Sequence, residues 1–448
     1  MEIITDPNSI LHQKAKKIKK FDEKLQKLVH NMTNELFRSK GVGLAAPQIS
    51  QSIRLIVIEY SPKRFLTNKE LKDNKERNIP LTIMINPKIT WQSKVKNTEN
   101  EGCLSLPDIE VPIKRSKEIH ATAQDINGKK IKIRAKGLYA RVLQHEIDHL
   151  DGILLTDRIN IKTDRIVFMG TPEFAAIILK RLINSPFKPY LVITEPDKPS
   201  GRGKTLTPPA VKILAKQENI ETWQPKYISQ IANRLSELMP DLFIVAAYGQ
   251  IIPKDILNAA QFGGINVHPS LLPKYRGSTP IQSAILNGDK ITGITIMKMD
   301  EKMDHGPILT QREVEVPNDF SFPDLNTGLA KKGASQLIGT IPLYLSKSVR
   351  GRSQNNENAT YTKKIIKRDG LINWREKSKI IDRKIRAYYP WPGAHTIING
   401  KKIKICQSHL ENDKLIIDRV QLEGKKEMTF DEFKRGWRGN LDFLDKIS

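Results

Sequence analysis

The strongest chemical signal in the sequence is QHEIDHLDG, residues 144–152. His145 and His149 are four residues apart, so a helix places both imidazoles on one face with Glu146 beside them. Two imidazoles at this spacing can bind one metal ion, and the carboxylate can then shuttle a proton at water that the metal activates. The pattern predicts a metal-dependent hydrolytic site on a helix.

A catalytic metal site of this kind needs a third protein ligand and an open coordination position. Glu173 lies 24 residues after His149, where a thermolysin-like protease keeps its glutamate, but it follows a strand that starts another domain. Cys103 lies upstream in EGCLSLP, although a lone cysteine is more often a core residue. The residues alone do not decide whether Glu173 or Cys103 is the third ligand. They also leave open the alternative that this unit is a metalloprotease.

A second set of polar residues lies in INVHPSLLPKYRG and MDEKMDHGPIL. Asn266 and His268 alternate with apolar residues at the end of a strand, so both side chains point to one side. Asp304 comes from a later loop. An asparagine, a histidine and an aspartate without a serine or cysteine nucleophile indicate polarisation of a carbonyl group rather than covalent catalysis.

Hydrophobic periodicity predicts the elements that position these residues. Residues 137–150 have apolar side chains near a period of 3.6, which predicts a helix. From residue 165 onward, buried-strand patterns (165–170, 190–197 and 241–249) alternate with helical ones, which is typical of βαβ units and a parallel sheet. The first turn, GTPEF, lacks G-x-G-x-x-G, so a dinucleotide is not indicated.

The C-terminal part begins with a polar segment, residues 346–365, which we interpret as a linker. After it, GLINW, IRAYYPWPGAHTIING, KKIKICQ and KLIIDRVQLEG predict short strands joined by turns, as in a small β barrel. Cys406 is expected in the core of one of these strands. The domains predicted from these patterns are residues 1–160, 165–345 and 366–448.

Composition limits the class of protein. The chain has 448 residues, a 39% hydrophobic content and two cysteines, which predicts about three globular domains, no disulfide framework and a cytoplasmic location. We expect no secretory signal and no membrane span. The formal net charge is +25, and residues 345–448 contribute 24 Lys and Arg against 13 Asp and Glu, which favours a nucleic-acid partner over a merely solvated surface.

Three motifs together, GVGLAAPQ (41–48), EGCLSLP (101–107) and QHEIDHLDG, resemble those of peptide deformylases, and the resemblance covers residues 1–158. It implies an α+β metallohydrolase domain that removes formyl groups from N-formylmethionyl peptides. The implied metal ligands are Cys103, His145 and His149. This set suits Fe(II), with Zn(II) or Ni(II) as substitutes, and the sequence does not choose among them.

The same resemblance implies further roles at the deformylase site. These are Glu146 as the acid and base, Gln48 and the backbone N–H of Leu104 as the oxyanion donors, and Gly43 in the substrate groove. Residues 61–80 depart from the pattern as a long charged stretch, which we interpret as a solvated loop.

The stretches FMGTPEFA, EPDKPSGRGK, AAYGQIIPK, NVHPSLLPKYRG and MDHGPIL resemble methionyl-tRNA formyltransferases. The resemblance implies an α/β parallel-sheet (Rossmann-like) domain and a small OB-like β barrel that grips tRNA. It makes Asn266, His268 and Asp304 the catalytic trio, with 10-formyltetrahydrofolate as the formyl donor. The implied folate contacts are Ser270, Leu271, Leu272 and Pro273.

The catalytic trio is shared by formyltransferases with other acceptors, so the acceptor is predicted from a separate segment. Arg202 and Lys204 lie in GRGKTLTPPAVK, a basic loop where the tRNA enzymes contact the acceptor stem. The sequence therefore predicts a bifunctional enzyme of translation initiation, acting on initiator methionyl-tRNA and on nascent peptides. The alternative is a metalloprotease-like hydrolase fused to a sugar or nucleotide formyltransferase.

Overall fold

The computed structural model describes residues 2–6, 8–39, 41–62, 78–158, 163, 165–200 and 205–437. The chain forms two compact units whose main boundary falls between residues 162 and 163. Most of the charged stretch 61–80, the junction residues 159–162 and the basic pair Arg202 and Lys204 lie outside the described residues. The predictions made for them stay predictions.

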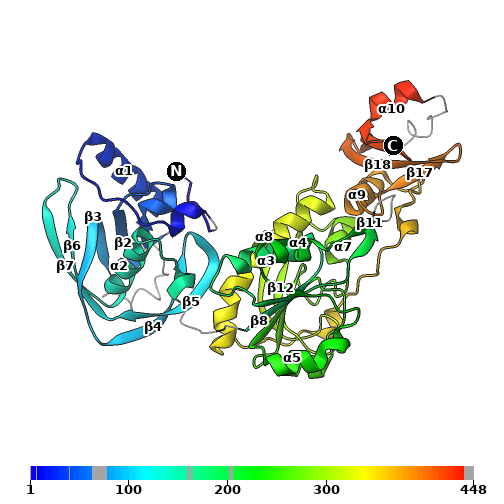
Figure 1. The fold of residues 1–448 in the computed structure, drawn as a ribbon. Helices are drawn as coiled ribbons and strands as arrows, with labels where there is room; N and C mark the ends of the chain where they lie inside the picture. Colours follow the sequence, from blue (N-terminus) through cyan, green and yellow to red (C-terminus); the bar gives the residue numbers. More distant parts are fainter. Residues whose placement is uncertain are drawn as a thin grey trace. The chain divides into compact units, whose positions relative to one another are not determined.

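The first unit, coloured blue to blue-green in Figure 1, is built around an antiparallel sheet. The sheet has the order β1-β2-β3-β6-β7, and β4 and β5 form a separate long hairpin. Its strands are β1 (Gly43–Ala45), β2 (Leu55–Tyr60), β3 (Ile79–Gln92), β4 (Lys96–Cys103), β5 (Leu106–Ser116), β6 (Glu118–Gln124) and β7 (Lys130–Lys136). Its helices are η1 (Ser9–His12), α1 (Glu23–Arg38), η2 (Ala46–Ile49), α2 (Gly137–Leu150) and η5 (Leu155–Arg158).

Helix α2 confirms the helix predicted over residues 137–150. Its side chains at positions 140, 143, 147 and 150 are buried against the sheet, in a core shared with β2, β3, β6 and β7. Because one face of α2 is held in this core, the polar residues at other positions around the helix keep a defined direction. Figure 1 shows α2 lying among the strands of this unit.

The second unit contains a seven-stranded sheet with the order β12-β9-β8-β13-β14-β15-β16. The first five strands are parallel, as the βαβ pattern predicts, but β15 and β16 are antiparallel to their neighbours. The sheet is therefore mixed rather than purely parallel. A short loop joins β15 to β16, which suits an antiparallel pair, whereas the connection from β14 to β15 contains helix α7 (Pro280–Asn287).

The elements of this sheet domain are as follows. The strands are β8 (Ile166–Gly170), β9 (Leu191–Ile193), β10 (Lys198–Ser200), β11 (Thr205–Thr207), β12 (Glu221–Trp223), β13 (Leu242–Ala246), β14 (Gly264–His268), β15 (Ile291–Lys298) and β16 (Ile308–Glu315). The helices are α3 (Glu173–Ile183), α4 (Ala210–Gln217), η6 (Ile228–Ile231), α5 (Ala232–Leu238), α6 (Lys254–Ala259), α7 (Pro280–Asn287) and α8 (Phe322–Leu345).

The tail is a small antiparallel β domain with the strand order β17-β18-β19-β20. Its elements are η7 (Asn356–Asn358), η8 (Lys367–Gly370), α9 (Ser378–Tyr388), β17 (His395–Ile398), β18 (Lys401–Glu411), β19 (Lys414–Leu422), β20 (Met428–Thr429) and α10 (Phe430–Gly436). The stretch IRAYYPWPGAHTIING contains the expected strand as β17, but its beginning is not a strand, because residues 385–388 end helix α9. Ile381, Ile385 and Tyr388, at i, i+4 and i+7, form its buried face.

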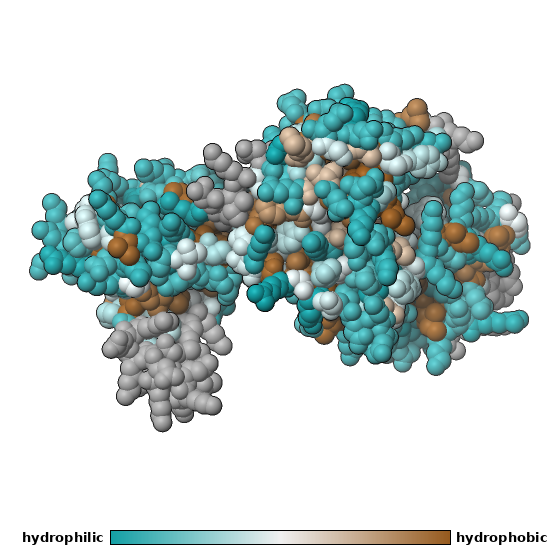
Figure 2. All heavy atoms as spheres, turned by 90° about the horizontal axis from the view of Figure 1, so that it is seen from below, coloured by the Kyte–Doolittle hydropathy of each residue, from teal (hydrophilic) through white to brown (hydrophobic). Residues whose placement is uncertain are grey.

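In the part of the chain that the structure describes, no helix is both long and apolar enough to span a bilayer. Figure 2 shows a face on which hydrophilic residues predominate and hydrophobic ones are scattered in small groups. Cys406 is half-buried on β18, and burial raises the pKa of its thiol to about 11. It is therefore a protonated strand residue at neutral pH.

Candidate active sites

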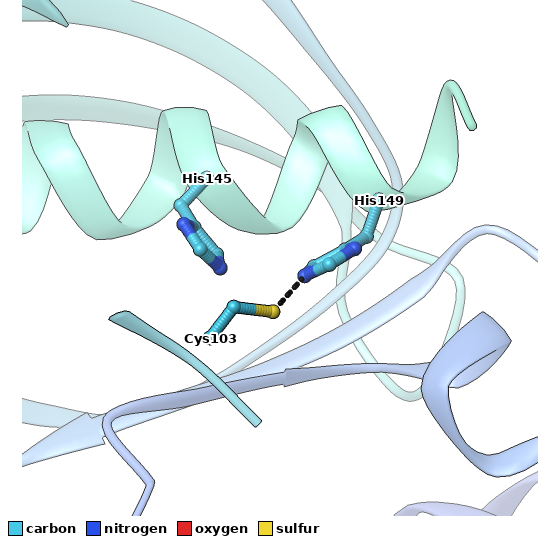
Figure 3. A group of neighbouring side chains, drawn as sticks. All are labelled: Cys103, His145 and His149. Atoms are coloured by element: carbon cyan, nitrogen blue, oxygen red, sulfur yellow. Dashed lines mark hydrogen bonds between the residues drawn. The ribbon is translucent and has the colours of Figure 1, made fainter. Parts of the chain in front are cut away.

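The first site lies between helix α2 and the end of strand β4. Figure 3 shows His145 and His149 projecting from one side of α2 toward Cys103. One ligand atom from each of the three residues lies within 4.8 Å of the other two, and Nε2 of His149 is 3.2 Å from Sγ of Cys103. A thiolate with two imidazoles, leaving a fourth position open, is a donor set that fits a catalytic divalent metal ion.

The carboxylate of Glu101 orients the imidazole of His145 through the ring nitrogen that faces away from Cys103. Oε2 of Glu101 is 3.1 Å from Nδ1 of His145, which leaves Nε2 to face Cys103. Arg115 donates two 2.9 Å hydrogen bonds to Glu101, and Arg141 donates another at 2.5 Å. Burial alone would raise the pKa of Glu101, but the hydrogen bonds from His145 and Arg115 outweigh it and lower that pKa to about 2. Glu101 is therefore a permanent anion beneath the ligand set.

The pKa values of the two imidazoles are shifted in opposite directions. Burial lowers the pKa of His149 well below its ordinary value, so its ring is neutral and free to bind a metal. Burial also opposes protonation of His145, but its hydrogen bonds with Cys103 and Glu101 raise its pKa well above the ordinary value. A metal ion at this site would therefore bind in competition with the proton on His145.

We expect Glu101→Gln to weaken metal binding by about 10- to 100-fold, because outer carboxylates fix the orientation and basicity of ligating histidines. The measurement is the metal dissociation constant of the full chain from competition with a chromophoric chelator. Glu99→Gln is the matched control, since the Glu99 side chain is more than half exposed and contacts Arg141 and Asn97 rather than His145. Equal affinities for the two variants would contradict the role given to Glu101.

Glu146 is buried directly beside the ligand set. Its Oε2 has no hydrogen-bond partner among the described residues, and burial raises its pKa to about 7. A Cβ atom at Gly43 would lie 2.1 Å from Oε1 of Glu146. Strand β1 can therefore approach the carboxylate of Glu146 only with a glycine at position 43. This close approach explains the glycine more specifically than the expected position of Gly43 in a substrate groove.

Gln48 and Leu104 complete the first site. The side chain of Gln48 is buried, its Oε1 accepts from the backbone of Ala45 at 2.8 Å, and its Nε2 lies 3.2 Å from Oγ of Ser105 and 3.7 Å from Sγ of Cys103. The amide hydrogens of Gln48 thus point toward the ligand set. Leu104 is half-buried and directly follows Cys103, and the donor role of its backbone N–H stays a prediction.

The second site lies at the carboxyl end of strand β14. Nδ2 of Asn266 donates to Oδ1 of Asp304 at 3.3 Å, and Nδ1 of His268 is 3.4 Å from the same oxygen. The other ring nitrogen of His268 is 2.9 Å from the carbonyl oxygen of Tyr275, and the backbone of Gly277 donates to Oδ2 of Asp304 at 2.8 Å. The three predicted residues form one group of contacting polar side chains.

This group opens into a cavity of about 440 Å³. Sequence reasoning had not singled out most of the residues that line it. They include Ala247, Tyr248, Gly249, Gln250, Ile251, Ile252, Met297, Met299 and Met303. The stretch AAYGQII was a signal for the first six, since it follows the carboxyl end of β13, and ligands of open α/β sheets bind at those strand ends.

The four predicted folate contacts lie elsewhere in the same loop. Ser270 and Leu272 are buried, and they hydrogen-bond with Lys274, Thr295 and Gln311. None of Ser270, Leu271, Leu272 and Pro273 is among the described residues that line the cavity. These contacts shape the turn that carries His268, and direct folate contact by the four residues stays a prediction.

Comparison with known proteins identifies the family of each part of the chain. Residues 1–165 match the family model described as Polypeptide deformylase, residues 164–341 match Formyl transferase, and residues 364–414 match Formyl transferase, C-terminal domain. A methionyl-tRNA formyltransferase of Thermodesulfovibrio yellowstonii is 39% identical over 306 residues, which cover 63% of this chain and 99% of that protein. The chain belongs to the methionyl-tRNA formyltransferase family. It carries a polypeptide deformylase domain ahead of the formyltransferase domains.

Two further relatives are each similar to one part of the chain. The methionyl-tRNA formyltransferase of Halalkalibacterium halodurans is 44% identical over 243 residues, 54% of this chain and 77% of that protein. The solved peptide deformylase of Thermotoga maritima is 36% identical and covers 36% of this chain and 97% of its own, with a TM-score of 0.31. The predicted family and order of domains are confirmed, as are a deformylase domain, a sheet with parallel strands and a small antiparallel β domain.

Proposed function

We propose that the chain is a bifunctional enzyme of translation initiation. Its second unit transfers a formyl group from 10-formyltetrahydrofolate to the amino group of methionyl-tRNA. Its first unit removes the formyl group from nascent peptides. The observation that supports this most directly is that each matched domain contains its own complete group of polar residues, Cys103, His145, His149 and Glu146 in one and Asn266, His268 and Asp304 in the other.

For the deformylase domain, Cys103, His145 and His149 would hold a divalent metal ion. Such an ion supplies Lewis acidity that lowers the pKa of water and polarises the formyl carbonyl. The donor set suits Fe(II), with Zn(II) or Ni(II) able to replace it, and it does not by itself choose among them. Glu146 takes the proton of the attacking water and returns it to the leaving amine. The amide of Gln48 and the backbone N–H of Leu104 donate to the oxyanion that forms on the formyl oxygen.

For the formyltransferase domain, the methionyl amine attacks the formyl carbon of the folate. Negative charge then develops on the formyl oxygen, which the Asn266 amide and the His268 ring would stabilise. Asp304 holds His268 in place and accepts the proton that the amine loses. Breaking the bond between the formyl carbon and the folate nitrogen completes the transfer and returns a proton to that nitrogen.

The partners follow from these two reactions. Initiator methionyl-tRNA binds the basic tail and the loop that carries Arg202 and Lys204, and the folate occupies the cavity beside β14. N-formylmethionyl peptides emerging from ribosomes are the substrates of the first unit. Both substrates occur in the cytoplasm, where we place the protein.

The test uses the purified full chain and five substrates in parallel, namely methionyl-tRNA, a formyl-methionyl tripeptide, formyl-methionyl-tRNA, an unformylated peptide and a sugar nucleotide. We expect formylation of methionyl-tRNA in the presence of 10-formyltetrahydrofolate and formate release from a formyl-methionyl tripeptide. Formyl-methionyl-tRNA should be hydrolysed far more slowly than the peptide, because it offers no extended peptide backbone for strand addition. Cleavage of an unformylated peptide would instead support a metalloprotease, and formylation of a sugar nucleotide in place of tRNA would support the other acceptor class.

A further inference from the structure

The polar segment that follows the catalytic sheet packs against the formyl-transfer site. Residues 352–363, here called the strap, lie within the interval interpreted as a linker. Arg352 exchanges two 2.8 Å backbone hydrogen bonds with Ile308 at the start of β16. Further along, the backbones of Thr360 and Thr362 form 2.8 Å hydrogen bonds on either side of Arg276. The strap is thus held at two places beside the loop that carries Asp304.

Between these two places, Gln354 bridges two elements of the site. Its Nε2 donates to the carbonyl oxygen of Asp304 at 2.9 Å and to that of Gly306 at 2.8 Å. Its Oε1 accepts from Arg276 Nη2 at 2.7 Å and Nε at 3.1 Å. Both amide hydrogens and the amide oxygen are therefore used, which leaves the side chain one orientation.

Arg276 is an unusual anchor for this amide. It is 1% exposed and is the largest fully buried side chain in the part of the chain that the structure describes. Its side-chain partners among the described residues are all neutral, namely Gln354, Asn356 and the hydroxyl of Tyr361. A buried cation without a carboxylate depends on such hydrogen bonds, so the strap and Arg276 require each other.

The backbone of Asp304 needs support from its surroundings. Its φ of +48° lies in the left-handed region, which is unfavourable for a residue with a side chain and persists only where neighbouring contacts enforce it. The carboxylate is held by Asn266, His268 and the backbone N–H of Gly277. The carbonyl oxygen of the same residue is held by Gln354.

We propose that Gln354 is a positioning residue for formyl transfer, and that the strap is a working part of this site rather than a spacer to the tail. By fixing the carbonyl oxygens of Asp304 and Gly306, Gln354 sets the direction in which the Asp304 carboxylate meets His268. This inference rests on the proposed formyltransferase function and concerns a residue that does not touch the substrate.

The test compares three variants of the full chain in formyl transfer from 10-formyltetrahydrofolate to methionyl-tRNA. Gln354→Ala removes both sets of hydrogen bonds. Gln354→Glu keeps an acceptor for Arg276 and adds an ion pair, but it turns carboxylate oxygens toward the two carbonyl oxygens. Ser353→Ala, next to it and exposed, is the matched control. Deformylation by the same preparations checks concentration and folding of the chain.

We expect kcat to fall about 10- to 100-fold in Gln354→Ala and Gln354→Glu, with KM for methionyl-tRNA within about a factor of two of the wild type. Ser353→Ala should match the wild type. If Gln354→Ala fails to fold, Gln354→Glu still decides the question. Wild-type kcat in Gln354→Glu, or an effect on KM alone, would overturn the positioning role. Absence of formyl transfer in the wild-type chain would instead refute the proposed function.

Discussion

Glu146→Gln is expected to lower kcat for deformylation of a formyl-methionyl peptide by about 10²- to 10⁴-fold, which is the usual contribution of a positioned acid or base. The amide has nearly the shape of the carboxylate, so it fits against Gly43 without a new clash. It cannot take a proton from water at neutral pH, however. The loss should therefore appear in kcat rather than in binding of the peptide.

Two further measurements separate this result from damage to the site. Metal content, measured by plasma mass spectrometry on the purified variant, should equal that of the wild type, because Glu146 is not in the predicted ligand set Cys103, His145 and His149. Formyl transfer by the same preparation should be unchanged, because its catalytic group is in the other unit. A variant that keeps its metal and its deformylase rate would show that another group moves the proton.

Asn266→Ala is expected to lower kcat for formyl transfer by about 10²- to 10³-fold, the usual effect of removing one oxyanion donor. The change removes an amide that lies in the cavity wall and donates to Asp304. Affinity for methionyl-tRNA, measured by filter binding, should be retained, because the tRNA contacts are predicted in other parts of the unit. Deformylation should also be retained.

The matched control for this prediction is Asn258→Ala on helix α6. Asn258 is exposed and does not line the cavity of the formyl-transfer site. It should leave all three measurements unchanged. If Asn266→Ala weakened tRNA binding as much as it lowered kcat, the residue would be a substrate contact rather than an oxyanion donor. Together with Glu146→Gln, this variant should separate the two activities of one chain in both directions.

The parts of the sites that could be predicted from the sequence depend on local spacing. His145 and His149 share a helix face because the helix repeats every 3.6 residues. Asn266 and His268 share a strand face because a strand alternates with a period of two. Their convergence with Cys103 and Asp304, by contrast, was supplied by resemblance to known families and not by spacing.

Some predictions of secondary structure and strand direction were wrong or incomplete because one local pattern in the sequence competed with another. IRAYY contains residues favourable for a strand, but the period from Ile381 to Tyr388 is helical, and the buried face of α9 decided the structure. Likewise, the apolar residues of β15 and β16 predict strands without fixing their direction. Their antiparallel pairing with each other and with β14 is seen only in the tertiary structure.

Short motifs were enough to predict the two families, the order of their domains and the residue types of both candidate catalytic groups. The contacts that hold those groups in place are visible only in the three-dimensional structure. Glu101 reaches His145 across 44 residues, Gly43 makes room for Glu146, and Gln354 fixes Asp304 across 50 residues. Such contacts arise where separate elements pack together, and no local period in the sequence records that packing.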